Sequence, residues 1–347
     1  MMVMVLAGDI GATKTNLGLF SSTAGGLQRL SFCSFPSCVE AELVGRIKEF
    51  LVQERAQLNL AGVCFGVAGP VQNGYVEATN LGLKLGESEL QKELGCASLV
   101  LVNDLYATAA AIPLLGESKL AILQTGSVAK VENSTAAILA PGTGLGMAFL
   151  VDAKKPQIFA SEGGHADFSP RNEMEVELWR YLKLRYGRVS RERLLSGPGL
   201  VNIYDWLGER SETESLVGAL PPLLSGSEKT AAAVVAAAEN GEKPATQALE
   251  IFVALLGSVA GDLALIGMAS GGLYLAGGIP TKIISHLRKT QFLSAFRDKG
   301  RMAPWLERIP VKVVLDPEAA LLGAARIAFN LQGGDHVARK KSSFGGG

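Results

Sequence analysis

A segment near the start of the chain has the residue types that bind phosphate. It follows an apolar run and begins with a carboxylate, Asp9, and its possible phosphate-binding residues are Gly11, Ala12, Thr13, Lys14 and Thr15. Backbone N–H groups, hydroxyls and an ammonium at such a tip can hold phosphate oxygens, and Asp9 can hold a hydrated Mg²⁺. The segment is not a Walker A loop, because that motif needs a second glycine before its lysine. An ordinary tight hairpin is the alternative interpretation.

A second segment of the same kind follows an apolar run in the second half of the chain. Its residues Gly142, Thr143 and Gly144 offer close backbone approach and a hydroxyl. Two such hairpins can grip the two sides of a triphosphate, so the pair supports a phosphate site better than either segment alone. Gly277 and Gly278 also follow a strand directly, as expected where backbone lies against a nucleoside. A strand-to-helix turn explains these two glycines equally well.

Asn103 and Asp104 stand between an apolar run and a helical pattern. At the end of a buried strand, Asp104 can act as a general base that accepts a hydroxyl proton during phosphoryl transfer. The alternative is structural, because Asn and Asp are both favoured as helix N-caps.

Glu162 and His165 lie in the segment Ser161–Phe168, separated by two glycines. The glycines make a helix unfavourable, which argues against a helical metal-ligand pair. The chain has only three histidines and no H-E-x-x-H motif, so a zinc site is not expected. On an extended turn, Glu162 and His165 can instead hydrogen-bond neighbouring sugar hydroxyls. Glu192, in a segment that begins like a helix cap and ends in a turn, has no function assigned by spacing alone.

Alternating strands and helices must position these groups. Apolar runs predict strands at 2–7, 16–20, 61–67, 99–102, 136–139, 147–151, 272–276 and 311–315. Helical patterns occupy 39–57, 106–112, 173–185, 201–206, 230–239, 251–270 and 319–329. A strand–turn–strand unit opens each half of the chain, and the alternation predicts α/β layers.

Size and charge limit the possible function classes. A chain of 347 residues suggests two domains, and its 33 basic and 33 acidic side chains give no field for nucleic acid or an anionic membrane. Four scattered cysteines and an N-terminus without a basic leader favour a reducing, cytoplasmic location. The stretch 251–270 is long enough to span a bilayer, but Asp262 and three glycines favour a buried helix.

With these residues in view, the chain resembles the bacterial-type glucokinases of the hexokinase–actin superfold. The resemblance runs in order through GDIGATKTNLGLF, Thr79-Asn80, LVNDLYA, APGTGLGMA, SEGGHADFSP, RERLLSGPGLVNIY, LYLAGGI and DKGR, over roughly residues 3 to 330. The EGGHxDF and SGPGL motifs are highly specific, whereas the glycine-rich loops are shared across the superfamily. The related repressor/kinase group has a Cys-rich zinc motif after its histidine. Here Asp167-Phe168-Ser169-Pro170 follows, so that zinc is not expected.

The resemblance implies an α/β, two-domain, actin-like and hexokinase-like (ribonuclease H-like) fold with a cleft between the domains. The expected small domain is 1–114 plus 316–333, the large domain is 115–315, and 334–347 is a flexible tail. Asp104 resembles the catalytic base of the family, Asn103 a sugar ligand, and Glu162, His165 and Glu192 the residues that bind glucose hydroxyls. Asp9 and Thr13 resemble one phosphate loop, Gly142 and Thr143 the other, and Gly277 and Gly278 part of the nucleotide site. Asn80 is a further sugar-site residue by resemblance.

The implied activity is transfer of the γ-phosphoryl group of ATP to the 6-hydroxyl of glucose, with Mg²⁺ and domain closure on glucose binding. Other hexoses, namely mannose, glucosamine or fructose, remain alternative substrates, and ADP or polyphosphate alternative donors. A non-catalytic sugar sensor of the same fold is a further alternative. A homodimer in the cytoplasm is the family expectation.

Overall fold

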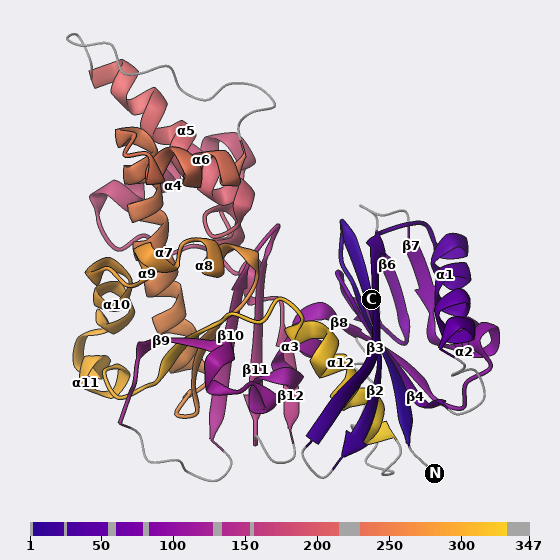
Figure 1. Cartoon of the computed structure of the whole chain (residues 1–347). Coiled ribbons are helices and arrows are strands. Elements are labelled where there is room, and N and C mark those ends of the chain that lie inside the picture. Colours follow the sequence, from indigo (N-terminus) through magenta and orange to yellow (C-terminus); the bar gives the residue numbers. More distant parts are fainter. Residues whose placement is uncertain are drawn as a thin grey trace, which may run out of the picture. The chain divides into compact units, whose positions relative to one another are not determined.

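The computed structural model describes residues 3–23, 26–54, 60–78, 83–127, 134–152, 156–214 and 230–331. It divides into two compact units (Figure 1). The first unit comprises Met1–Leu115, Pro156–Ile158 and Asp316–Gly347, and the second comprises Gly116–Lys155 and Phe159–Leu315. The short piece Pro156–Ile158, which the sequence placed in the large domain, joins the first unit because Ile158 packs against an apolar cluster of that unit.

The first unit is built on a five-stranded sheet with the order β3-β2-β1-β4-β8. Its strands are β1 (Met4–Ile10), β2 (Lys14–Thr23), β3 (Gly26–Pro36), β4 (Leu60–Val67) and β8 (Leu99–Asn103). β1, β4 and β8 are parallel, whereas β1–β2 and β2–β3 are antiparallel hairpins. The carboxyl ends of three parallel strands therefore meet at one edge of this sheet.

Helices cover both faces of this sheet. On one face, α1 (Glu40–Gln53) and α2 (Glu87–Leu94) bury apolar side chains against alternate residues of β1, such as Leu6 and Ile10. On the other face, α3 (Asp104–Ala111) and α12 (Ala319–Asn330) pack against Val5 and Ala7. Because side chains alternate along a strand, Asp9 points to the same face as Val5 and Ala7. A small sheet of β5 (Val71–Gln72), β6 (Tyr75–Ala78) and β7 (Leu83–Gly86) adjoins α2.

The second unit has a six-stranded sheet with the order β12-β11-β10-β13-β14-β9. The strands are β9 (Leu120–Gln124), β10 (Thr135–Pro141), β11 (Leu145–Val151), β12 (Gln157–Ser161), β13 (Gly272–Leu275) and β14 (Val311–Val314). β10 and β11 form the second predicted hairpin, and β13 runs parallel to β10. The helices are α4 (Glu173–Tyr186), α5 (Gly197–Glu214), α6 (Ala231–Glu239), α7 (Lys243–Ile266), α8 (Gly278–Lys282), α9 (Ile284–Leu287), α10 (Thr290–Arg297) and α11 (Ala303–Leu306).

α7 is the central helix of the second unit. Within the described residues, it is the one helix long and apolar enough to cross a membrane, but two-thirds of its apolar window is buried inside the protein. Its Asp262 is paired with Lys299 at 2.7 Å, so the charge within the apolar stretch has a partner. The predicted buried helix is therefore confirmed.

The start of α5 differs from the sequence prediction. The glycines of the SGPGL motif were expected in a turn, but Gly197 is the first residue of this helix. Proline is tolerated in the first turn because its missing N–H has no helical partner there. The Ser196 hydroxyl accepts a hydrogen bond from the Gly199 backbone N–H at 3.1 Å, as an N-cap does.

Candidate functional site

The β1–β2 hairpin tip presents the predicted phosphate-binding residues of the first unit. Its backbone is closed by a hydrogen bond from the Gly11 N–H to the Lys14 carbonyl at 3.0 Å. Ser37 holds the tip from outside, since its hydroxyl donates to the Gly11 carbonyl at 2.6 Å and its N–H to the Thr13 carbonyl at 3.1 Å. Ala12, Thr13 and Lys14 are exposed, as a phosphate-binding tip requires.

Thr15 differs from its neighbours in this hairpin. Its side chain is fully buried, and its hydroxyl oxygen lies 3.2 Å from that of Ser37. The hydroxyl of Thr15 is therefore engaged inside the first unit, and the phosphate-facing surface of the tip comes from residues 12–14.

Asp9 lies half-buried at the end of β1 and accepts a hydrogen bond from the Asn16 amide at 3.4 Å. The pKa of Asp9 is raised to about 6, chiefly by burial and also by the negative charge of Asp104, whereas Asn16 and Lys14 oppose the shift. A carboxylate held in this way is stabilised by any cation that comes close to it.

Asn103 and Asp104 lie at the end of β8, where α3 begins. Asn103 is the N-cap: its side-chain oxygen accepts from the N–H groups of Leu105 at 3.0 Å and Tyr106 at 3.4 Å. Its amide nitrogen donates to the Gly69 carbonyl at 3.0 Å. Asn103 is therefore the N-cap of α3, and Asp104 is the first residue of the helix.

The Asp104 carboxylate is half-buried and accepts a hydrogen bond from the Leu105 N–H at 2.8 Å. Burial raises its pKa, and hydrogen bonds from the adjacent backbone and Asn103 oppose that shift. A carboxylate with a raised pKa is a stronger base than an exposed one. Because β1, β4 and β8 run parallel, Asp9 and Asp104 lie at the same edge of the first sheet.

In the second unit, the β10–β11 hairpin carries Gly142, Thr143 and Gly144. The Gly142 N–H donates to the Gly144 carbonyl at 2.8 Å, which closes the turn, and Thr143 is exposed at its tip. Gly277 lies directly behind this hairpin, where a Cβ would come within 2.7 Å of the Pro141 carbonyl oxygen. Gly277 also has a φ of 85° and caps α8, so the fold itself requires glycine there. Gly278 is exposed at the first position of α8.

The three predicted sugar-binding residues of the second unit lie together. His165 stands between two carboxylates, with its Nε2 3.9 Å from Glu162 Oε2 and its Nδ1 3.9 Å from Glu192 Oε1. Glu162 and His165 are exposed, and Glu192 is half-buried. The segment Gly163–His165 is a 3₁₀ turn and not the extended turn predicted from sequence. Glycine at 164 permits this turn, because a Cβ there would lie 2.1 Å from the Leu145 carbonyl oxygen.

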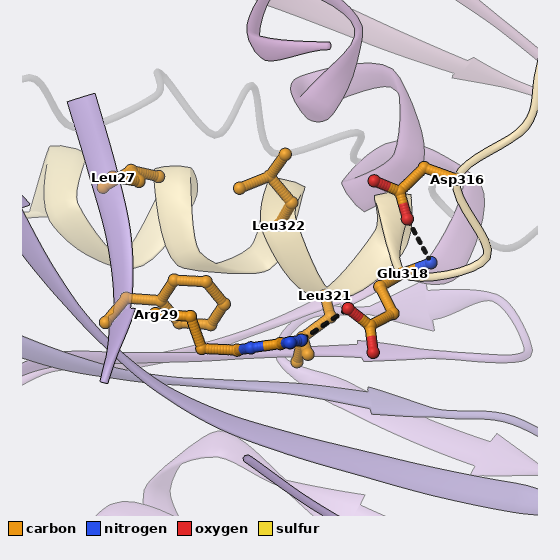
Figure 2. A pocket seen from close by; sticks show the side chains of 7 residues that line it. Leu27, Arg29, Asp316, Glu318, Leu321 and Leu322 are labelled. Carbon is orange, nitrogen blue, oxygen red and sulfur yellow. Dashed lines mark hydrogen bonds and ion pairs between the residues drawn. The ribbon is translucent and has the colours of Figure 1, made fainter. Parts of the chain in front are cut away.

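A separate pocket in the first unit contains none of these groups. It has a volume of about 230 Å³, and its lining residues are Phe20, Leu27, Arg29, Asp316, Glu318, Leu321 and Leu322. Figure 2 shows the Arg29 guanidinium pointing at the Glu318 carboxylate, with which it is ion-paired, beneath the start of α12. The Asp316 carboxylate accepts from the Glu318 N–H at 3.0 Å (Figure 2). These charges are engaged with each other, and the lining supplies no group with the predicted chemistry.

Sequence reasoning missed two residues that hold the first-unit site. Asn16 contacts Asp9, and Ser37 contacts the hairpin tip. Asn16 had a recognisable feature, a polar side chain in an otherwise apolar strand, whereas Ser37 is distant in sequence and had none. Asn80 lies outside the described residues.

The described residues fit Mg²⁺ bound largely through water. They contain no cluster of three or more His, Cys, Asp or Glu side chains that would form a protein metal cage. Mg²⁺ is usually held by one or two carboxylates together with water and substrate phosphates. Asp9 is a carboxylate that could hold such an ion. Burial and the charge of Asp104 disfavour its ionised form, and a nearby cation would stabilise that form.

Comparisons with known proteins extend over nearly the whole chain. The sequence profile of the family described as Glucokinase matches residues 6–331. A glucokinase from Trichormus variabilis is 39% identical over 344 residues, covering 95% of this chain and 100% of that protein. The crystal structure of a glucokinase from an Antarctic psychrotroph has a TM-score of 0.80 and 29% identity, covering 94% of this chain and 99% of the other.

A more distant solved structure has the same fold. It is a ROK family glucokinase from Streptomyces griseus in complex with glucose and AMPPNP, with a TM-score of 0.59 and 20% identity, covering 94% of this chain and 99% of the other. The predicted two-domain α/β fold of the actin and hexokinase type is confirmed by these likenesses.

Proposed function

This chain belongs to the glucokinase family and phosphorylates glucose, and we propose that it uses ATP as donor, the 6-hydroxyl as acceptor and Asp104 as general base. The observation that carries the assignment of the base is the half-buried Asp104 carboxylate, whose burial raises its pKa at the sheet edge that also holds Asp9. ATP as donor is supported by the structural neighbour bound to AMPPNP, an ATP analogue.

Each proposed role matches the chemistry of the side chain or backbone that is assigned to it. Glu162, His165 and Glu192 bind sugar hydroxyls, and Asp104 accepts the proton of the 6-hydroxyl as it attacks phosphorus. The hairpin tips at 12–14 and 142–144 donate backbone and hydroxyl hydrogen bonds to the phosphates. Asp9 would hold Mg²⁺ through water, and the ion would neutralise charge on the phosphates when bound. Gly277 and Gly278 give the nucleoside close access to the backbone.

Replacement of Asp104 tests the assignment of the base. We expect Asp104→Asn and Asp104→Ala to lower kcat by about 10²–10⁴, the usual contribution of general-base catalysis, with a smaller change in the KM for glucose. A coupled assay for glucose 6-phosphate measures both constants. The comparison variant is Glu162→Gln, for which the KM for glucose should rise more than kcat falls. Near-normal turnover in both Asp104 variants would remove Asp104 from this role.

Substrate breadth and assembly are separate proposals. The sugar specificity can be measured with a panel of glucose, mannose, glucosamine and fructose, and the donor with ATP, ADP and polyphosphate. A homodimer located in the cytoplasm, acting in glycolysis, stays a prediction, for which sedimentation analysis measures the oligomeric state.

A further inference from the structure

The two oxygens of the Glu192 carboxylate face two different parts of the second unit. Oε2 accepts a hydrogen bond from the Leu145 backbone N–H at 2.9 Å, at the end of the Gly142–Gly144 hairpin turn. Oε1 faces His165, whose Nδ1 is 3.9 Å away. One side chain therefore connects the predicted phosphate hairpin to the predicted sugar-binding residues.

The segment that carries Glu192 also holds the other end of the hairpin turn. The Gly197 N–H donates to the Gly142 carbonyl at 2.8 Å. Between these two attachment points, the Ser196 hydroxyl donates to the Glu192 carbonyl at 2.8 Å, which fixes the intervening backbone. The turn is thus attached at its first residue through main chain and at its last through the Glu192 side chain.

Glycine at position 144 makes this attachment possible. A Cβ on residue 144 would come within 2.6 Å of Glu192 Oε2, closer than non-bonded atoms approach. The φ of Gly144 is not positive, so the backbone itself does not require glycine there. The constraint on this residue therefore comes from the carboxylate that packs over it.

We propose that Glu192 is a positioning residue that couples the sugar site to the phosphate hairpin, so that glucose and nucleotide each strengthen binding of the other. The proposal rests on the proposed function, in which Glu192 binds a glucose hydroxyl and the hairpin binds phosphate. A hydroxyl that donates to Oε1 fixes the carboxylate, which in turn fixes the Leu145 N–H and the turn. The turn then loses less conformational freedom when phosphate binds, and the coupling is reciprocal.

The test is the ratio of two dissociation constants for Mg²⁺–AMPPNP, measured by calorimetry without glucose and with saturating glucose. For the unaltered chain we expect glucose to tighten nucleotide binding at least about fivefold, the lower end of typical allosteric coupling. Glu192→Asp keeps the charge but is one methylene too short to reach both partners, so its ratio should fall to near one. Glu192→Gln keeps an acceptor for the Leu145 N–H at full length and should retain most of the ratio.

Glu162→Gln is the matched control, because Glu162 belongs to the same sugar site and has no contact with the hairpin among those described. It should weaken glucose binding and leave the ratio unchanged once glucose is saturating. If Glu192→Asp abolishes glucose binding or folding, the same ratio is measured in Gly144→Ala instead. This variant retains Glu192 but displaces its carboxylate from the turn. The ratio should fall toward one in this variant also.

The proposal is overturned by a ratio near one in the unaltered chain, by an unchanged ratio in Glu192→Asp, or by an unchanged ratio in Gly144→Ala where that variant decides. Loss of the ratio in Glu192→Gln with retention in Glu192→Asp would equally overturn it, because charge and not reach would then matter. Failure of the proposed function gives a different result, in which the unaltered chain neither binds nor phosphorylates glucose.

Discussion

Two acidic residues lie at one sheet edge of the first unit. Their negative charges destabilise the fold, although the proposed chemistry depends on them. Asp9 and Asp104 end β1 and begin α3, and each is partly withdrawn from water. Repulsion between them and the loss of hydration both favour protonation, so Asp9 has a pKa of about 6. The ionised Asp9 carboxylate therefore lowers the stability of the folded chain near neutral pH. In the proposed function this charge is the one that a cation beside the phosphates requires.

Replacement of Asp9 by Asn should stabilise the chain at pH 8. The pKa of Asp9 is about 6 in the folded state and 3.8 when unperturbed, so the folded state binds more protons between these values. The contribution of Asp9 to the free energy of unfolding is therefore fully present below about pH 4. It is lost as the pH rises through 6. With allowance for solvent screening, we expect Asp9→Asn to gain about 1–2 kcal/mol at pH 8 and nothing at pH 4.

Urea unfolding of both proteins at pH 4, 6 and 8 measures this difference. Asn at position 9 can still accept the hydrogen bond from Asn16, so the comparison isolates the charge. A difference in unfolding free energy that does not change with pH would show that the Asp9 carboxyl is not the cause.

Candidate site residues could be picked out from the sequence where residue type and chain position suffice, although their chemical roles stay predictions. Asp104 at a strand end and Glu162 with His165 around two glycines are examples. What the sequence did not contain was which hydrogen bonds these groups make. The burial of Thr15, the contact of Asn16 with Asp9 and the reach of Glu192 to Leu145 depend on tertiary neighbours.

At the level of elements, the position of α3 sets the position of Asp104. α3 packs against α12, the last helix of the first unit, where Gly323 faces the Ala107 carbonyl. A Cβ on residue 323 would lie 1.7 Å from that backbone oxygen, so the two helices approach as closely as glycine allows. Within the described residues, α12 therefore controls where Asp104, the proposed base, is held.

Gly323→Ala should lower both stability and turnover. The contact is with backbone, so α3 must shift, and we expect a loss of about 1–3 kcal/mol, which exceeds the gain of about 1 kcal/mol from helix propensity. Because α3 begins at Asp104, kcat should fall more than the KM for glucose rises. Urea unfolding and the coupled assay measure the two effects.

The matched control is Gly45→Ala in α1, where a Cβ meets no atom within 4 Å. The free energy of unfolding of that variant should rise by about 0.5–1 kcal/mol, because alanine has a higher helix propensity than glycine and meets no steric clash there. Its kinetics should be normal. If Gly323→Ala behaves like Gly45→Ala, the close approach of α12 and α3 is not what positions the base.

Central elements were easier to predict than edge elements. β1, β4 and β10 lie inside their sheets and appear in the sequence as short apolar runs because both of their faces are buried. β3 and β12 lie at sheet edges and carry mostly exposed or half-buried side chains, so no apolar run indicated them. The start of α5 was missed because glycine and proline indicate turns unless the N-cap at Ser196 is known.

At the level of the whole molecule, the two units have separate apolar cores. One cluster lies wholly in the second unit and surrounds α7, and two clusters lie on the faces of the first-unit sheet. Domains with their own cores generally fold as units. Three of the predicted glucose-binding residues, Glu162, His165 and Glu192, belong to the second unit, whereas Asn103 and Asp104 belong to the first.

Glucose should therefore raise the melting temperature of one unit more than that of the other. We expect calorimetry to resolve two transitions, and glucose at 100 times its Kd to stabilise the second unit by about 2.7 kcal/mol, or about 5–10 °C. Gly45→Ala identifies the transition of the first unit, because it should shift that transition alone. Glu162→Gln should reduce the glucose-induced shift at the same glucose concentration. A shift confined to the transition that Gly45→Ala marks would contradict the assignment of the sugar site to the second unit.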